Sequence, residues 1–346
     1  MTARRVASFA ALRPSRVTSK QTLFAAAALA VCSANSAWAQ GGASQAPPPY
    51  PVKPIRLIVP FTPGGGADFV ARLFAPRLNE AFGQPVVVEN RPGGSTIIAG
   101  EVVAKAPPDG HALFMATFTN AVNPSLHPKA PWDIVRDFVP VSLLATVSYT
   151  LVVHPSLPAK TPRELVALAK AQPGQLNFAS AGNGAPGHLA GELLNIVAQV
   201  RLVHVPYKGA APALTDVMAG QVPITFGNNI ATLPHLKSGR LRALGVTSAR
   251  RSSLLPDVPS MIESGLPDFV VVGWYAIFTT AGTPQSSIAK LHGRLANSVR
   301  DAEVQRRLSA DGSEPVGSSP TELAGFLRGE IAKWGKVVKT AGLKAD

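Results

Sequence analysis

Apolar residues along this chain follow two patterns, which predict alternating strands and helices. Continuous β-branched runs such as residues 55–59 predict buried strands, whereas segments such as 68–82, apolar on one face, predict amphipathic helices. Further strands are predicted at 84–89, 112–117, 176–179, 201–205, 223–226 and 241–246. Further helices are predicted at 96–106, 161–171, 186–197, 209–218, 286–299, 304–310 and 320–339. The repeated β-α-β order predicts mainly parallel sheets flanked by helices, and therefore an α/β fold.

Two longer apolar stretches join this series into two α/β units. Residues 138–153 are interrupted by polar side chains, which predicts two consecutive strands, and residues 269–278 form the other long stretch. We expect the segments near 145–152 and 270–276 to pair as two hinge strands. That pairing would return the C-terminal helices to the first unit.

The helix predicted at 161–171 has the clearest start signal in the chain. Thr161 is assigned as its N-cap, Pro162 as its first helical residue, and Glu164 as the residue that closes a capping box. This start lies at the opening of the second α/β unit.

A glycine-rich turn separates the first predicted strand from the first helix. Pro63 and the glycines Gly64, Gly65 and Gly66 end the strand, and Asp68 opens the helix. This geometry can direct free backbone N–H groups at an anion, because glycine lets the backbone approach a ligand closely. A purely structural turn fits this stretch equally well. Asp68 is interpreted as a first-turn helix residue in preference to a catalytic acid.

The same pattern recurs in the second unit and decides between these interpretations. The stretch LNFASAGNGAPGH at 176–188 is again a strand, a polar glycine turn and a helix start. Two more strands end in small polar groups, at 116–120 and 224–229. Ligands of open parallel α/β sheets bind beyond the carboxyl ends of the strands, so four such ends predict one cleft that suits a small carboxylate.

The first 39 residues are a different kind of sequence. Five basic residues and no acidic one precede the apolar run 23–32, and Ala37-Trp-Ala39 follows. This order predicts a secretory signal peptide at 1–39, cleaved after Ala39, and a flexible leader at 40–51. Cys32 lies in a loose lipoprotein-like box, but Val31 occupies a position that normally requires a small residue, which argues against lipid attachment.

Cleavage would change the charge and the cysteine content. Of 33 Lys and Arg residues 28 would remain against 20 Asp and Glu, so the net charge falls from +13 to +8. The only cysteine is also removed, which excludes disulfides and thiolate metal sites from the mature chain. Its basic residues are scattered and aromatic residues make up 6%, so a field that attracts small anions is favoured over nucleic-acid binding.

Common enzyme motifs are missing. The first glycine turn has Phe69 where G-x-G-x-x-G requires glycine, so no dinucleotide cofactor is expected. Ser180 lacks the first glycine of a nucleophile elbow. His188 and Glu192 share a helix face, but without H-E-x-x-H we expect no metal and interpret His188 as capping the turn or hydrogen-bonding in the cleft. His154 and His204 are interpreted as structural.

From about Tyr50 to the C-terminus the chain resembles the periplasmic solute-binding proteins of tripartite tricarboxylate transporters, the Bug receptors. The resemblance rests on motifs that run in order along the chain, among them PFTPGGGAD at 60–68, VVVENRPGG at 86–94, NFASAG at 177–182, VPYKG at 205–209 and GWY at 273–275.

The resemblance implies a two-domain Venus-flytrap fold in the periplasm. Domain 1 would comprise 52–148 and 276–346, and domain 2 would comprise 149–275. A monomer would hold a small carboxylate between its domains and deliver it to a two-component membrane permease. Its implied ligand-binding residues are Pro63, Gly64, Gly65, Gly66, Asp68, Thr117, Thr119 and Asn120 in one domain and Ser180, Ala181, Gly182, Asn183, His188, Gly227, Asn228 and Asn229 in the other.

One position departs from the family pattern. Family members commonly carry an acidic residue where this chain has Gly227. Our hypothesis is that a partner for a ligand ammonium group is missing here, which favours a non-amino mono- or dicarboxylate.

Two other classes of protein remain as alternatives. The first is a secreted hydrolase or isomerase that uses Asp68, His188 or Ser180 on a small carboxylate, and it requires a nucleophile and a base within hydrogen-bond reach. The second is a ligand sensor that acts on a signalling partner. Binding without turnover would separate the receptor from the enzyme, and loss of uptake in a deletion strain would separate it from the sensor.

Overall fold

The computed structural model describes residues 49–310 and 312–344. The description below concerns the unit Tyr50–Asp346. The predicted signal peptide and most of the leader lie outside the described residues. Within those residues, no helix is both long and apolar enough to cross a membrane.

Three parallel strands begin the fold, each followed by a helix. β1 (Ile55–Val59) lies between β2 (Val86–Asn90) and β3 (Ala112–Thr117), and every residue of β3 is buried. The helices that follow these strands are α2 (Gly66–Phe82), the short η1 (Gly94–Thr96) with α3 (Ile97–Ala104), and α4 (Phe118–Leu126). Parallel pairing of successive strands confirms the predicted β-α-β order.

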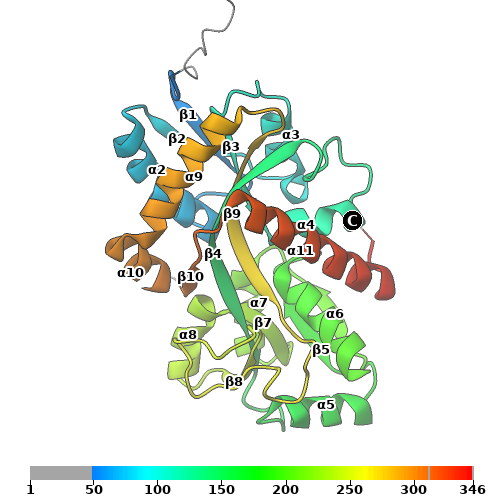
Figure 1. Cartoon of the computed structure of the whole chain (residues 1–346). Helices are drawn as coiled ribbons and strands as arrows, with labels where there is room; N and C mark the ends of the chain where they lie inside the picture. Colours follow the sequence, from blue (N-terminus) through cyan, green and yellow to red (C-terminus); the bar gives the residue numbers. More distant parts are fainter. Residues whose placement is uncertain (1–48, 311, 345–346) are drawn as a thin grey trace, which may run out of the picture. The chain divides into compact units, whose positions relative to one another are not determined.

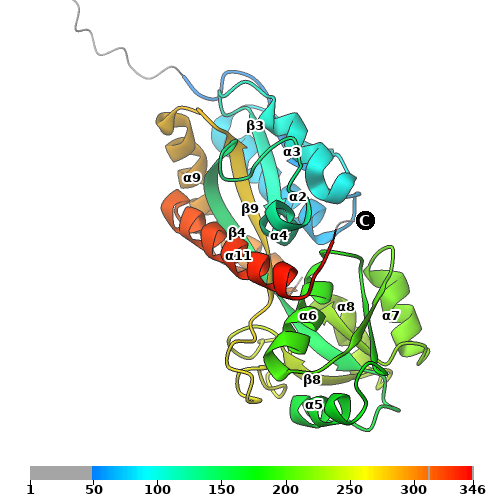
Figure 2. The same cartoon turned by 90° about the vertical axis from the view of Figure 1, so that its right-hand side faces the viewer.

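Two long strands connect this sheet to a second one (Figures 1 and 2). β4 (Phe138–Val153) and β9 (Val272–Thr280) are antiparallel partners, and β9 also pairs with β3. The far end of β4 pairs with β7 (Ile224–Asn228) and β8 (Arg242–Val246). We call the part built on β2, β1 and β3 the first lobe and the part built on β7, β5 and β6 the second lobe.

The second lobe repeats the architecture of the first. β5 (Asn177–Ser180) pairs in parallel with β7 and with β6 (Val203–Pro206). Its helices are α5 (Pro162–Ala171), α6 (Pro186–Ala198), α7 (Ala210–Met218) and α8 (Asn229–Lys237). After β9 the chain forms α9 (Gln285–Arg300), α10 (Ala302–Ala310), β10 (Ser313–Pro315) and α11 (Pro320–Thr340).

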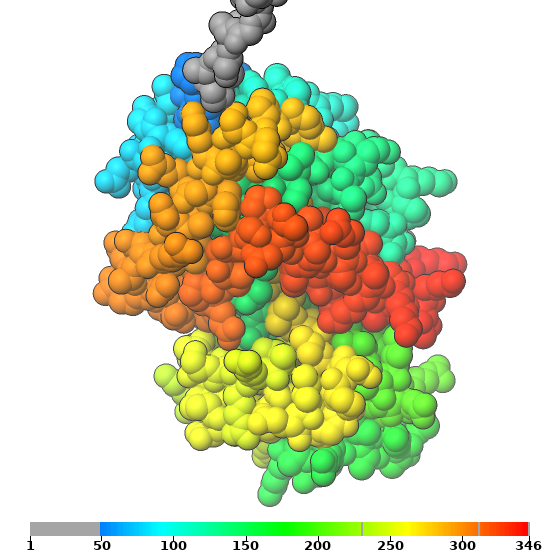
Figure 3. Space-filling model, viewed as in Figure 1, coloured from blue at the N-terminus to red at the C-terminus, as the bar shows by residue number. Residues whose placement is uncertain are grey.

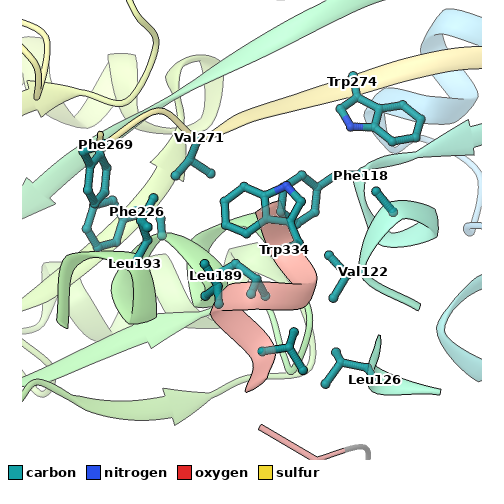
Figure 4. Close-up of a cluster of buried hydrophobic side chains, with 14 of the residues drawn as sticks. Phe118, Val122, Leu126, Leu189, Leu193, Phe226, Phe269, Val271, Trp274 and Trp334 are labelled. Atoms are coloured by element: carbon teal, nitrogen blue, oxygen red, sulfur yellow. The ribbon is translucent and has the colours of Figure 1, made fainter. Parts of the chain in front are cut away.

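The C-terminal helices return to the first lobe, as predicted, and one of them also contacts the second. α9 packs against α2 and β4, whereas α11 packs against α4 and β4 of the first lobe and against α6 of the second. In Figure 3 the red C-terminal segment lies next to green and yellow atoms of the second lobe. A continuous apolar cluster follows α11 across this junction, with Trp334 near its middle (Figure 4).

The prediction of two consecutive strands at 138–153 is wrong, because the structure has the single strand β4 there. Two of the polar side chains that indicated a break, Ser142 and Thr150, are buried and hydrogen-bonded. Ser142 Oγ donates to Ser318 O at 2.8 Å, and Thr150 Oγ1 donates to Asn229 Oδ1 at 2.6 Å. Two register shifts against β9 let the strand bend without ending.

Three elements were not predicted, namely α4, α8 and β10. Both helices contain a proline, Pro124 and Pro234, which disfavours helix in sequence-based reasoning. The capping box predicted for α5 is only half formed. Thr161 Oγ1 accepts from Glu164 N at 3.2 Å, but the Glu164 carboxylate accepts from the N–H of the residue before Thr161, at 2.6 Å.

Candidate ligand-binding site

Four helices begin around one cavity of about 460 Å³ between the lobes, which we call the cleft. α2 and α4 come from the first lobe, and α6 and α7 come from the second. The cleft is lined by Phe61, Thr62, Gly65, Gly66, Ala67, Thr117, Phe118, Thr119, Tyr149, Ala181, Ala185, Pro186, Gly209, Ala210, Gly273, Trp274 and Tyr275. For each of the four helices, this lining includes the N-cap residue and the first helical residue.

These helix starts leave backbone donors for a ligand. Gly65, Ala185 and Gly209 are the N-caps of α2, α6 and α7, and none of them supplies a side-chain cap. The first N–H groups of a helix have no partner within it, and the positive end of the helix dipole lies at the same place. The cleft is therefore suited to an anion, although no lysine or arginine is among its described lining residues.

Two buried polar groups of the lining keep unused hydrogen-bonding capacity among the described residues. They are the Thr117 hydroxyl, whose capping box with Asn120 leaves its proton unused, and Trp274 Nε1, on residues only 5% and 1% exposed. Buried polar groups are nearly always satisfied, so such atoms indicate that a ligand or ordered water completes them. The indole can only donate, whereas the hydroxyl can donate or accept.

Aromatic side chains supply much of the remaining wall. Tyr149 and Tyr275 come from the two paired long strands, and Phe61 precedes the first glycine turn. Burial raises the pKa of Tyr149, so its phenol stays a neutral donor at physiological pH. Neutral donors on an apolar wall favour a ligand that combines a carboxylate with carbon surface.

Asp68 stabilises the first glycine turn and is not part of the described cleft lining. Its carboxylate accepts from Gly64 N, Arg72 Nε and Asn90 Nδ2, each at 3.0 Å, and the residue is 4% exposed. Burial raises the pKa of Asp68, but the hydrogen bonds from these three groups and the Arg72 charge together hold it below its usual value. Its contacts support the helix-start interpretation.

The second glycine turn is stabilised in the same way. Ser180 Oγ lies 2.6 Å from His204 Nε2, accepts from Gly182 N and donates to the carbonyl of Gly182. His188 Nδ1 accepts from Gly184 N at 3.1 Å. The nucleophile-base pair that the enzyme alternative required is thus present, but Ser180 is 2% exposed and bonded to its own turn.

His188 of α6 stacks on His204 of β6, with ring centroids 3.8 Å apart. Burial first, and the neighbouring His204 second, lower the pKa of His188 to about 3. His188 Nε2 lies 3.9 Å from a Glu192 carboxylate oxygen, which is too far for a hydrogen bond. In its turn-capping role His188 matches its sequence-based interpretation.

His188 is expected to make the folded state acid-sensitive. The unfolded chain takes up a proton at this histidine near pH 6.5, but the folded chain does so only near pH 3. Stability from neutral His188 is thus present above about pH 6.5 and is lost progressively as the pH falls towards 3. Urea midpoints between pH 7.5 and 4 measure this loss, and His188→Gln should flatten it. His235→Gln on α8 is the matched control and should keep the wild-type slope.

Of the remaining residues predicted to bind the ligand, some line the cleft and others are buried in the protein interior. Thr117 and Thr119 line the cleft, while the fully buried Asn120 accepts from Thr117 N at 2.7 Å and donates to Thr96 Oγ1 at 2.9 Å. Asn229 is also fully buried and is bonded to Thr150 and Ser252. Asn120 thus caps the start of α4, Asn229 links the start of α8 to Thr150 of β4, and neither belongs to the described lining.

The predicted set overlaps the cleft in part. Its members in the lining are Gly65, Gly66, Thr117, Thr119 and Ala181. Gly227 and Asn228 line a smaller adjoining cavity, and Asn183 is not among the described lining residues of either cavity.

Sequence reasoning missed most of the aromatic wall and the start of α7. Trp274 and Tyr275 were noticed as a motif within a strand but were not assigned to the site. The only available signal was the aromatic pair itself, next to Gly273 in a strand long enough to cross between lobes. For the start of α7 the sequence offers only the motif VPYKG at 205–209, and the φ of +120° at Gly209 gives the physical reason for a glycine there.

This arrangement defines a class of protein, in which a cleft between two α/β domains, surrounded by helix N-termini, holds a small solute. The chain belongs to the tripartite tricarboxylate transporter receptor family, whose profile matches residues 70–343. It is 38% identical to Protein BugT of Bordetella pertussis over 297 residues, which is 85% of this chain and 91% of that protein. This is a family of periplasmic solute-binding receptors.

Solved structures share the fold. A R. palustris protein solved with adipate superposes with a TM-score of 0.76 at 36% identity, covering 85% of this chain and 98% of that one. MatC from Rhodopseudomonas palustris, solved with bound malate, gives a TM-score of 0.72 at 33% identity and covers 84% of this chain and all of that one. These likenesses confirm the predicted two-domain α/β fold and the predicted family.

Proposed function

We propose that this chain is an exported receptor that captures a small carboxylate between its two lobes and delivers it to a two-component membrane permease. The observation that carries the proposal is the meeting of four helix N-termini around one cleft that also contains two buried polar groups with unused hydrogen-bonding capacity. Related structures solved with adipate and malate support the same ligand class.

The proposed ligand contacts come from both lobes. Gly65, Gly66, Thr117 and Thr119 would bind from the first lobe, and Ala181 with the start of α7 would bind from the second. Closure by hinge motion near residues 148–149 and 275–276 would exclude water and strengthen these polar contacts. We propose that the receptor acts as a monomer in the periplasm, after cleavage behind Ala39.

The test is thermal unfolding of the chain from Gln40 to Asp346 against a panel of small carboxylates. A ligand that binds only the folded state stabilises it by about 2.7 kcal/mol at a hundredfold excess over Kd, which shifts the midpoint by several degrees. We expect such a shift with at least one carboxylate, and the compound should be recovered unchanged. Consumption of the compound would contradict the receptor function, and so would the absence of any shift with protein that has been unfolded and refolded free of bound ligand.

The panel should also include amino acids, because of Gly227. A Cβ atom at this position would lie 2.5 Å from Thr232 Cγ2, and no Asp or Glu is among the described lining residues of the cleft or of the adjoining cavity, so neither offers a carboxylate partner for an ammonium group. We expect non-amino carboxylates to bind more tightly than the corresponding amino acids. Tightest binding by an amino acid would refute this preference.

A further inference from the structure

A second cavity of about 90 Å³ opens beside the cleft within the second lobe, and we call it the side pocket. The two cavities share five lining residues, so they lie side by side. The shared residues are Tyr149, Ala181, Ala185, Pro186 and Ala210. The side pocket therefore lies beside the start of α6 and of α7, where the anion is expected.

The deeper wall of the side pocket is mainly apolar. Ala213 and Leu214 of α7, Phe226 of β7 and Ala231 of α8 form much of it. Two polar residues also line it, but Thr225 Oγ1 donates to Ala179 O at 2.9 Å and Asn228 Oδ1 accepts from a backbone N–H at 2.7 Å. No ionisable side chain other than the Tyr149 phenol is among its described lining residues.

The size of the side pocket limits what can enter it. An engineered cavity of about 150 Å³ holds a benzene molecule, so a side pocket of about 90 Å³ suits a few methylene or methyl groups better than an aromatic ring. A second carboxylate there would lose its hydration without gaining a charged partner, which is strongly unfavourable. The space and its chemistry both select an uncharged aliphatic group.

We propose that the ligand is a carboxylate with an uncharged aliphatic tail, and that the side pocket receives this tail. The inference rests on the proposed function, because it places the carboxylate at the helix starts of the cleft. Ala213 and Leu214 are then specificity-determining residues, since their side chains set the depth of the pocket. The bare backbone at Gly227 leaves this wall without a charged side chain.

Calorimetric titration with two series of acids tests the proposal. The probes are straight-chain monocarboxylates from acetate to octanoate and dicarboxylates from malonate to suberate. We expect the affinity for monocarboxylates to rise about fourfold per methylene until the pocket is full. At equal carbon number the monocarboxylate should bind more tightly than the dicarboxylate.

Two variants of the pocket wall make the test specific. Ala213→Leu fills the side pocket without adding to the cleft lining, so the loss of affinity should grow with tail length. Leu214→Ala deepens the pocket and should move the optimum to a longer acid, which keeps the proposal testable if the leucine variant fails to fold. Ala219→Leu, on the exposed C-cap of α7, is the matched control and should keep the wild-type series.

The outcomes separate this inference from the proposed function. The side-pocket inference would be overturned if dicarboxylates bound more tightly, if affinity did not rise with each methylene, and if Ala213→Leu weakened binding equally for all tail lengths. The receptor function would then remain intact. Binding of no carboxylate in either series would overturn both. The inference would be established if Ala213→Leu moved the optimum to a shorter acid and Leu214→Ala moved it to a longer one.

Discussion

Replacing Trp334 with alanine should lower the free energy of unfolding by about 3–5 kcal/mol, the usual cost of truncating a buried tryptophan. The residue is fully buried, and its ring packs edge-on against Phe118 with centroids 4.8 Å apart. Its indole N–H donates to the Glu330 carboxylate at 2.9 Å. The alanine variant would leave both a large cavity and a buried carboxylate without its donor, so the two losses add.

The effect should extend to ligand binding because of where Trp334 lies. Figure 4 shows it between Phe118 and Val122 of α4 and Leu189 of α6, in the apolar cluster that joins the two lobes. Phe118 is also the first residue of α4 and lines the cleft. Loosening this contact should therefore weaken binding of any carboxylate that stabilises the wild-type chain.

Urea unfolding followed by circular dichroism measures the stability change, since loss of a tryptophan would complicate fluorescence. Trp334→Phe retains an aromatic ring and should cost clearly less, and Lys336→Ala on the exposed face of α11 should cost less than about 0.5 kcal/mol. A loss below about 1 kcal/mol in the alanine variant would show that α11 does not hold the lobes together as described.

A second large effect is expected from Gly66→Ala, which should weaken carboxylate binding roughly ten- to a hundredfold. A Cβ atom at Gly66 would lie 2.1 Å from Tyr275 Oη and 3.1 Å from Tyr275 Cζ. The phenol would have to move, and it lines the same cleft as the start of α2. Because the φ of Gly66 lies outside the left-handed region, alanine is compatible with its backbone, and the free energy of unfolding should change little.

Gly65→Ala is the matched control, since a Cβ there would meet only the carbonyl of Thr62, at 3.8 Å. Both glycines line the cleft, so a difference between the variants isolates the Tyr275 contact. The double variant Gly66→Ala with Tyr275→Phe removes the closest atom and should recover part of the affinity lost by Gly66→Ala alone. Equal losses in the two single variants would refute this explanation, as would a double variant without any recovery.

The sequence predicts those site residues whose role depends on their neighbours in the chain. The turns at Gly64–Gly66 and Ser180–His188 were identified because glycine clusters after apolar strands have a local cause and a local consequence. The roles of Asn120 and Asn229 were assigned to the ligand because both follow strands. Their fully buried side chains instead bond to Thr96 and Thr150, which are distant in sequence.

The aromatic residues of the cleft are site residues that the local sequence pattern did not predict. Tyr149 and Tyr275 belong to apolar runs whose pattern predicts only strand, and whether a strand residue faces core or cleft depends on its partners. Ala145 of β4 pairs with Tyr275, and Tyr149 pairs with Asn228 of β7. That register brings side chains from both long strands to the cavity between the lobes.

By itself the sequence determined the α/β class, the two glycine turns and the resemblance that names the family. It also predicted pairing of the long strands near 145–152 and 270–276, of which residues 145–148 and 272–275 pair. These depend on periodicity, turn chemistry and contiguous motifs, which are encoded over a few residues at a time. Only the tertiary structure decided that β4 is a single strand, that α11 contacts both lobes and that a side pocket opens beside Gly227. Each of these features arises where segments far apart in the chain pack together. The free energy that favours such packing comes from many residues at once, so the sequence around any one of them does not predict it.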